Sequence, residues 1–238
     1  MTQDQFWGEL HRRTESFDLL CHPFYKAWTA GELSREDLRD YAAEYYHHVQ
    51  AFPQYLLALA ARLPDGDLRR AILENFSDEM ALETPAALPH HALWLKFAAA
   101  MGANVADVRT REPIAAIREL ADTFTRFAAD GAPAEALAAF YAYESQVPRV
   151  AAAKEAGLKG RYGADDETCA YFHLHKTADL RHAQVWREQL DNLLAEKPEL
   201  AGAALNAAET AAHALWRALD GINHARHNRG RSAMASQS

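Results

Sequence analysis

The sequence predicts an all-α protein, a single-domain bundle of seven to eight helices. Hydrophobic residues make up 49% of the 238 residues, and Ala and Leu dominate them. The chain holds 11 Gly and 9 Pro, and long stretches contain neither. This composition favours helices, because Ala and Leu are among the best helix formers while Gly and Pro interrupt them. Since no repeat or long linker is visible, we expect one domain over residues 1–227 and a polar, disordered tail over residues 228–238.

Local signals place the helices along the chain. Ser34 is a helix-capping residue with Asp37 three positions on, and Pro64-Asp65-Gly66 reads as a turn. Proline is tolerated in the first turn of a helix, and three prolines stand near predicted starts: Pro89, Pro113 and Pro133. The predicted helices cover about 2–20, 22–30, 35–63, 67–84, 89–102, 112–129, 133–156, 165–196 and 199–227.

Charge and cysteine usage exclude several classes of protein. The formal net charge of -8 argues against non-specific binding to nucleic acid, which needs clustered Lys and Arg. No apolar run approaches the length of a membrane span, and the first ten residues lack a signal-peptide pattern. Cys21 and Cys169 are far apart and in no metal or redox spacing. We therefore expect a cytoplasmic protein without nucleic-acid or membrane partners.

A polar stripe stands out in the predicted helix 165–196. His175, Asp179 and His182 follow one another at i, i+4 and i+7, so they share one face of a regular helix. Two imidazoles and a carboxylate on one face suit iron, manganese or zinc. The alternative is an Asp–His pair on a helix surface that binds no metal.

Other predicted helices carry further metal-capable residues. Glu144 lies in a segment rich in Ala, Leu, Phe and Tyr, where a lone buried carboxylate is costly unless it is paired or metal-bound. Together the candidate ligands are Glu79, His90, Glu144, His175, Asp179 and His182. Three carboxylates and three imidazoles suit a dinuclear site of the kind found in helical bundles. Glu79 taken alone could equally be a solvated helix residue.

Tyrosines near the candidate ligands are a second feature of the sequence. Six of them fall on segments that we expect to surround the site: Tyr25, Tyr41, Tyr45, Tyr46, Tyr141 and Tyr143. Buried tyrosines commonly pack with their hydroxyls satisfied, but beside an oxidising metal they can be electron sources or substrates. Lys154 follows Glu144 by ten residues, nearly three turns, and so lies roughly on the same face. A surface lysine is the alternative.

Several motifs together resemble a known family. They are His22 to Trp28, Gly31 to Leu33, Tyr41 to Tyr46, His48, Ala51 to Leu56, Tyr143 to Arg149, Lys154, Tyr171-Phe172 and Asp179 to Ala183. In this order and spacing they look like the CADD-like proteins, first named for association with death domains. Their bacterial members are non-canonical para-aminobenzoate synthases for folate, within the haem-oxygenase-like di-metal oxidases. The resemblance covers most of the chain and fades after about residue 195.

The resemblance implies a haem-oxygenase-like fold and a cofactor of two iron ions or one manganese and one iron. The six candidate ligands match the family's ligand positions, and dioxygen and an external reductant are the implied co-substrates. It also implies that Tyr25 supplies the aromatic ring of para-aminobenzoate and Lys154 its amino group. Tyr41 and Tyr143 match tyrosines placed for radical transfer.

One departure concerns the first carboxylate ligand. The family's spacing from that Glu to the His is four residues shorter than Glu79 to His90, and Glu83 would restore it. Four residues are about one helical turn, so a ligand face could be kept. The surrounding pattern, Asn75 and Asp78-Glu79, favours Glu79, and Glu83 stays its rival.

The sequence is also compatible with other functions. The same metals could oxidise an external small molecule, such as an amino acid or a fatty acid, without needing Tyr25 or Lys154. A metal-free enzyme resembling thiaminase II or pyrroloquinoline quinone synthase C is a further alternative. The thiaminase version needs a nucleophilic Cys, and Cys169 lies off the ligand stripe. A metal-free interaction protein is the last alternative. A homodimer is the default expectation for assembly.

Overall fold

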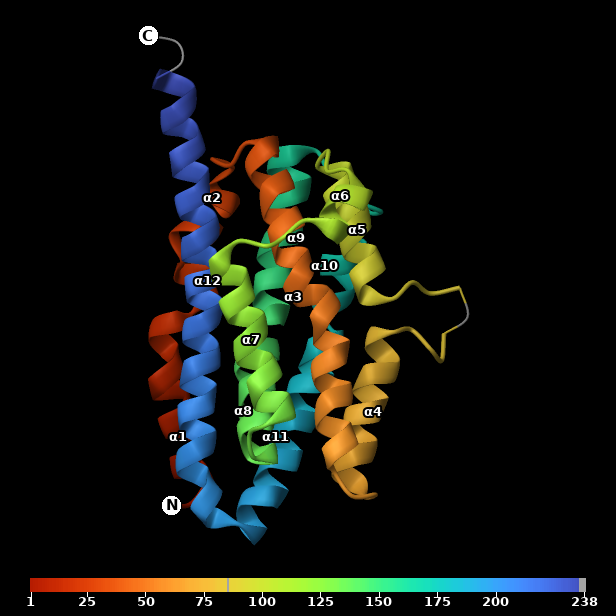
Figure 1. The fold of residues 1–238 in the computed structure, drawn as a ribbon, viewed down its shortest axis with the longest axis vertical. Helices are drawn as coiled ribbons and strands as arrows, with labels where there is room; N and C mark the ends of the chain where they lie inside the picture. The colour runs from red at the N-terminus through yellow and green to blue at the C-terminus, as the bar shows by residue number, and fades with distance from the viewer. Residues whose placement is uncertain (85, 236–238) are drawn as a thin grey trace.

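The structure, a computed structural model, describes residues 1–84 and 86–235, with side chains through residue 230. Its helices, labelled in Figure 1, are α1 (Gln3–Thr14), α2 (Pro23–Ala30), α3 (Arg35–Arg62), α4 (Asp67–Glu79), α5 (His90–Ala100), α6 (Val105–Thr110), α7 (Ala115–Ala129), α8 (Pro133–Glu144), α9 (Val147–Tyr162), α10 (Ala170–His175), α11 (Ala178–Glu196) and α12 (Ala201–Ala235). Every other regular element among the described residues is a short 3-10 turn. The all-α prediction is confirmed.

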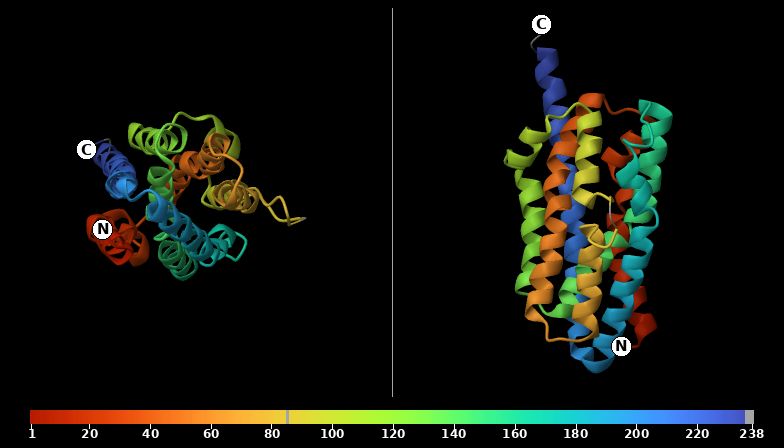
Figure 2. Two further views of the ribbon diagram at one scale, coloured as in Figure 1. Left: turned by 90° about the horizontal axis from the view of Figure 1, so that it is seen from below. Right: turned by 90° about the vertical axis from the view of Figure 1, so that its right-hand side faces the viewer.

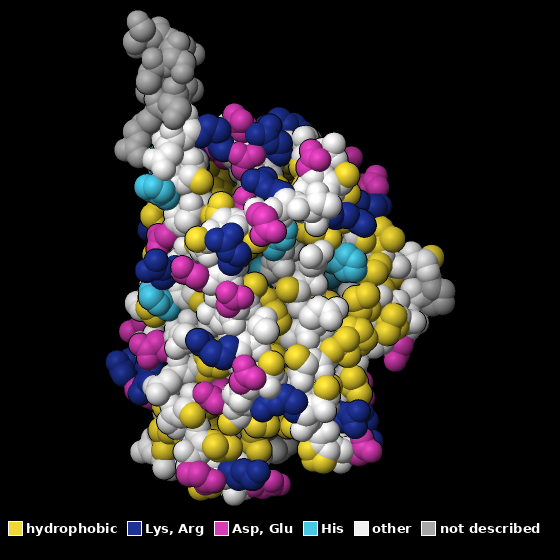
Figure 3. All heavy atoms as spheres, viewed as in Figure 1, with side chains coloured by type: hydrophobic (Ala, Val, Ile, Leu, Met, Phe, Trp, Pro, Cys, Tyr) yellow, Lys and Arg dark blue, Asp and Glu magenta, His cyan; other side chains and the backbone are white. Residues whose placement is uncertain are grey.

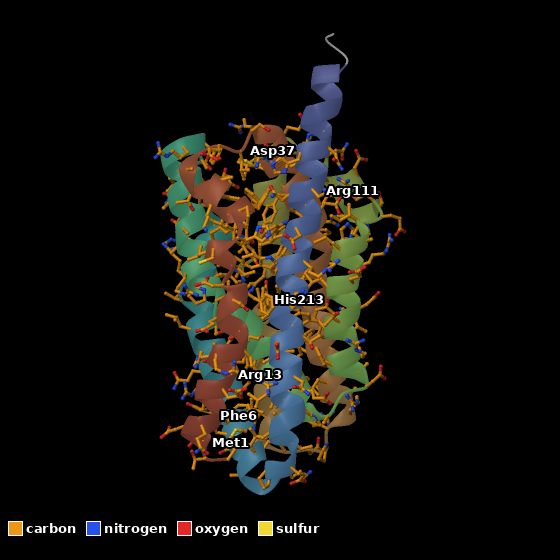
Figure 4. All side chains as sticks on the ribbon, turned by 90° about the vertical axis from the view of Figure 1, so that its left-hand side faces the viewer. Met1, Phe6, Arg13, Asp37, Arg111 and His213 are labelled. Carbon is orange, nitrogen blue, oxygen red and sulfur yellow. The ribbon has the colours of Figure 1, made fainter. Side chains whose placement is uncertain are left out.

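The long helices run side by side and form a bundle (Figures 1 and 2). α12 follows the length of the bundle and packs against α1, α7 and α8, while α3 packs against α4, α5 and α7. Figure 4 shows Arg13 of α1 beside α12, where its guanidinium donates to Asn206 over 2.7 Å. The core is rich in aromatic rings, with Trp28, Trp94 and Trp186 fully buried.

Two predicted helices are each divided by a break. The segment predicted over 133–156 separates into α8 and α9, because Pro148 has no N–H to donate to the preceding turn and its ring crowds it. The segment predicted over 165–196 begins later, at α10, and breaks after His175. There Lys176 reaches across to Glu155 of α9 over 2.6 Å. His175 therefore does not share one regular helix with Asp179 and His182, as the i, i+4, i+7 pattern predicted.

Several helix ends also differ from the predictions. The segment over 2–20 is α1 followed by two 3-10 turns, and α6 was not predicted. α4 ends at Glu79 instead of 84, since Ala81 takes a left-handed conformation with φ of 52° and the Leu82 N–H turns back to the Ser77 carbonyl over 2.9 Å. α12 continues past 227 to Ala235. The remaining residues of the predicted tail, 236–238, lie outside the described residues.

The surface carries both signs of charge. On the face in Figure 3, Lys and Arg side chains are interspersed with Asp and Glu, and hydrophobic side chains gather over α4 and α5. Within residues 1–84 and 86–235, none of the helices combines the length and apolar character that crossing a membrane requires.

The contact between α2 and α9 gives a test of the packing. A Cβ added at Gly157 would meet Trp28 Cδ1 at 2.8 Å and Nε1 at 3.0 Å, whereas a Cβ at Gly160 meets nothing within 4 Å. We expect Gly157→Ala to lower the free energy of unfolding by about 1–3 kcal/mol, because Trp28 must move. Gly160→Ala should raise it by about 0.5–1 kcal/mol. Denaturant unfolding of both variants measures the difference, and equal stability would contradict this packing.

Candidate metal centre

The six candidate ligands stand at or near the ends of helices. Glu79, Glu144 and His175 are the last residues of α4, α8 and α10, and His90 is the first residue of α5. Asp179 and His182 lie in the first two turns of α11. All six side chains are buried. Because these helices begin or end at the site, the side chains at their ends lie together in the bundle interior.

These side chains form two groups that share Glu79. Glu79, His90 and His175 make one group, and Glu79, Glu144, Asp179 and His182 make the other. Within each group, one nitrogen or carboxylate oxygen per residue lies within 4.8 Å of the others. The break between α10 and α11 assigns His175 to the first group and Asp179 and His182 to the second. A carboxylate common to both groups is suited to bridging two metal ions.

The nitrogen–oxygen contacts inside the groups fall short of hydrogen-bond geometry. His90 Nδ1 lies 2.9 Å from Glu79 Oε2, yet that nitrogen has no hydrogen bond. His182 Nδ1 lies 3.4 Å from Asp179 Oδ1 and 3.6 Å from Glu144 Oε1, again without a hydrogen bond. Buried nitrogen and oxygen atoms that converge without forming hydrogen bonds suit a metal cation, which takes the place of a histidine proton when it binds. This donor set therefore fits two ions of iron or manganese.

Outer contacts orient two of the imidazoles. His175 Nδ1 lies 2.7 Å from the Tyr171 carbonyl, which accepts its N–H and leaves Nε2 free for a metal. His182 Nε2 lies 3.2 Å from Asp78 Oδ2, so its N–H is donated there and Nδ1 faces the carboxylates. Arg181 in turn forms an ion pair with Asp78. A hydrogen-bonded outer nitrogen is typical of metal-binding histidines.

Buried charges in the centre shift one another's pKa. Burial would raise the pKa of Glu79, but His90, His175 and His182 outweigh it and hold that pKa at about 2. Burial would lower the pKa of His182, but Asp179 and Glu144 raise it to about 10. Burial raises the pKa of Glu144 and of Asp179. A metal ion binding beside His182 must therefore displace a proton, so acid weakens metal binding.

The rival first ligand lies elsewhere. Glu83 is exposed in the connection between α4 and α5 and belongs to neither group, whereas Glu79 belongs to both. Glu83 therefore lies at the surface, while Glu79 at the end of α4 lies in the site.

Lys154, Tyr25 and Tyr41 form a second buried cluster, on α9, α2 and α3. The Lys154 amine donates to the Tyr41 hydroxyl over 2.6 Å, and the Tyr41 and Tyr25 hydroxyls are 3.0 Å apart. The same amine lies 4.4 Å from the centre of the Tyr25 ring. Burial lowers the pKa of Lys154 well below its usual value, which favours the neutral form of the amine. Lys154 is thus not the surface residue of the alternative prediction.

Aromatic rings join the two clusters. The Tyr171 ring stacks on His175 with centroids 3.9 Å apart, and Trp94 packs on Tyr171 at 4.8 Å. Tyr45 follows at 5.5 Å from Trp94, and Tyr41 at 5.5 Å from Tyr45. A cavity of about 20 Å³ lies along this route, bounded by buried residues that include Tyr25, Tyr143, Lys154 and Tyr171.

Two of the six tyrosines lie away from the cavity, and three residues that contact the candidate ligands were not predicted. The Tyr141 hydroxyl lies 3.5 Å from His11, away from the cavity, and Tyr46 does not line the cavity either. The three residues that were not predicted are Trp186, Asp78 and Tyr171. Trp186 donates a hydrogen bond to Glu144. Trp186 follows His182 by four residues and Tyr171 precedes His175 by four, so helical spacing could have identified both.

A pair of substitutions tests the shared carboxylate. We expect wild-type protein reconstituted with ferrous iron or manganese to hold about two ions per chain. Glu79→Gln should lose at least half of them, because both groups lose a ligand. Glu83→Gln removes the same charge from the exposed loop and should keep the full content. Elemental analysis after gel filtration measures both, and the reverse pattern would assign the ligand to Glu83.

Comparisons with known proteins agree with this centre. The family described as "iron-containing redox enzyme" matches residues 39–216. A 4-aminobenzoate synthase from Chlamydia pneumoniae is 37% identical over 213 residues, covering 88% of this chain and 92% of that protein. A TenA homologue from Pseudomonas syringae has a TM-score of 0.80 at 18% identity and covers 92% of this chain and 93% of that one. A domain with a heme oxygenase-like fold from Shewanella denitrificans has a TM-score of 0.74 at 18% identity over 95% and 94% of the two chains, which confirms the predicted fold. The chain therefore belongs to the family of iron-containing redox enzymes.

Proposed function

We propose that this protein makes 4-aminobenzoate, the para-aminobenzoate of folate synthesis, from its own Tyr25, with Lys154 as the amino donor. The observation that carries the proposal is the buried Lys154 amine 4.4 Å from the centre of the Tyr25 ring. The relative named 4-aminobenzoate synthase supports the identity of the product.

The product itself dictates what must change in a tyrosine. 4-Aminobenzoate keeps the aromatic ring and one further carbon, so the Cα–Cβ bond must break and Cβ must become a carboxyl carbon. Nitrogen must also replace the phenolic oxygen. This exchange is redox-neutral at the ring carbon, and the oxygen leaves as water. Release of the nitrogen from Lys154 breaks its Nζ–Cε bond and oxidises Cε to an aldehyde. Because Cβ of Tyr25 and Cε of Lys154 are both oxidised, we propose dioxygen and an external reductant as co-substrates.

Two iron ions, or one manganese and one iron, would be held by the two groups that share Glu79. Bound there, the pair supplies the oxidising chemistry of dioxygen. The aromatic route from Tyr171 through Trp94 and Tyr45 then carries the oxidation towards Tyr41 and Tyr25. Tyr143 lines the cavity on this route, in keeping with its proposed role in radical transfer.

Lys154 has the properties of an amino donor. Burial lowers its pKa and so favours the neutral form, whose lone pair can attack an electron-poor ring. Oxidation of Tyr25 makes its ring electron-poor, and the amine already lies over that ring. The Tyr41 hydroxyl contacts both groups, so it can accept the proton that the amine loses on forming a C–N bond while it passes its own proton to the Tyr25 oxygen.

The cavity argues against an external substrate. Its volume of about 20 Å³ holds little more than a single water molecule, which is far less than an amino acid or a fatty acid needs. The thiaminase-like alternative is disfavoured for another reason. Burial raises the pKa of the Cys169 thiol to about 11, so this thiol is a poor nucleophile at neutral pH.

Isotope labelling tests the self-sacrifice directly. Protein grown with carbon-13 tyrosine and nitrogen-15 lysine is loaded with iron and manganese and exposed to air and reductant, without an added aromatic compound. We expect 4-aminobenzoate that carries both labels, with a yield that does not exceed one product per chain. Mass spectrometry of the small-molecule fraction measures the labels and the yield.

Matched variants sharpen this test. Tyr25→Phe and Lys154→Met should release no product, while Tyr46→Phe, a buried tyrosine outside the cavity, should release as much as wild type. If Tyr25→Phe still consumes dioxygen in the presence of an added substrate, the external-substrate function replaces the proposal. Unlabelled product would mean that the ring or the amine comes from outside the chain.

A further inference from the structure

A surface pocket between α4 and α11 reaches the outer side of the metal centre. It has a volume of about 260 Å³ and is bounded by Ala71, Glu74, Asn75, Asp78, Glu83, Arg181, His182 and Val185. α4 and α11 lie in contact beside this pocket (Figure 2). His182 is one of the candidate ligands and is only 2% exposed, whereas Glu74, Glu83 and Arg181 are exposed. The pocket therefore connects solvent with the second ligand group.

Asn75 is the unexplained residue of this pocket. It is 3% exposed, and neither its amide oxygen nor its amide nitrogen has a hydrogen-bond partner among the described residues. An unpartnered buried amide is destabilising, so its polar atoms favour a partner from outside the chain. Asn75 precedes Glu79 by one helical turn and lies on the same face of α4. An amide oxygen is a good ligand for a divalent cation or its bound water.

The charges in the pocket favour a cation. Glu74, Asp78 and Glu83 contribute carboxylates, and Arg181 carries the only ammonium or guanidinium group among the described residues that line it. Arg181 forms an ion pair with Asp78, and its side chain is 67% exposed, so it can swing away into solvent. Asp78 also accepts the N–H of His182, which ties this ion pair to a ligand.

We propose that this pocket is the route by which divalent metal ions reach the centre, with Asn75 as a transient oxygen ligand and Arg181 as its gate. The proposal rests on the metal centre of the proposed function. The cavity beside Lys154 is a poor alternative route, because its volume of about 20 Å³ is too small for a hydrated ion and its lining is mostly apolar.

Metal uptake can be followed without any turnover. Metal-free protein is mixed anaerobically with cobalt(II), and the visible absorption of coordinated cobalt gives the rate of uptake. We expect the Glu74→Gln/Glu83→Gln double variant to load about tenfold more slowly at low salt, with the difference shrinking as salt screens the carboxylates. Arg181→Gln should load several-fold faster, and Asn75→Leu more slowly. The final cobalt content of all these variants should equal that of wild type.

Glu188→Gln/Glu196→Gln is the matched control for charge, because both residues are exposed on α11 outside the pocket. It should load at the wild-type rate. Loading of the Glu74→Gln/Glu83→Gln variant at the wild-type rate at low salt, or equal slowing in the control, would overturn the route while leaving the metal centre intact. If wild-type protein takes up no cobalt, the metal centre itself fails and the route with it.

Discussion

The buried carboxylate of Glu79 belongs to both ligand groups, and the arrangement around it depends on how its charge is balanced. Glu144 and Asp179 add two further buried carboxylates. Burying such charges without partners costs free energy, and three imidazoles that lie among the carboxylates offset this cost. Two divalent cations would complete this balance, and His90 Nδ1 and His182 Nδ1, which have no hydrogen-bond partner, would bind them once their protons are displaced.

Breaks in the helices position the candidate ligands, and the break after His175 contacts the helix that carries Lys154. His175 ends α10, and the next residue, Lys176, forms an ion pair with Glu155 over 2.6 Å. Glu155 is the neighbour of Lys154 on α9. The backbone beside the His175 imidazole is therefore held by the helix whose Lys154 amine lies over the Tyr25 ring. Displacing α9 would disturb both clusters together.

The candidate ligands could be predicted from the sequence, because carboxylates and imidazoles are unusual in helices otherwise rich in Ala and Leu. The roles expected of Tyr25 and Lys154 came only from the family resemblance. The break after His175 could not be predicted, since no Gly or Pro marks it in the sequence. Asp78 could not be separated from ordinary surface acids without knowing that His182 faces it. Tyr141 and Tyr143 stand two residues apart on α8 and so point to nearly opposite sides of that helix, and only Tyr143 lines the cavity.

Glu79 would serve both metal ions, and anomalous scattering from crystals of the iron- and manganese-loaded protein would show whether it does. We expect two anomalous peaks. One should lie among Glu79, His90 and His175, and the other among Glu79, Glu144, Asp179 and His182. A single peak, or a peak coordinated by Glu83 with Glu79 unbound, would rule out a shared Glu79.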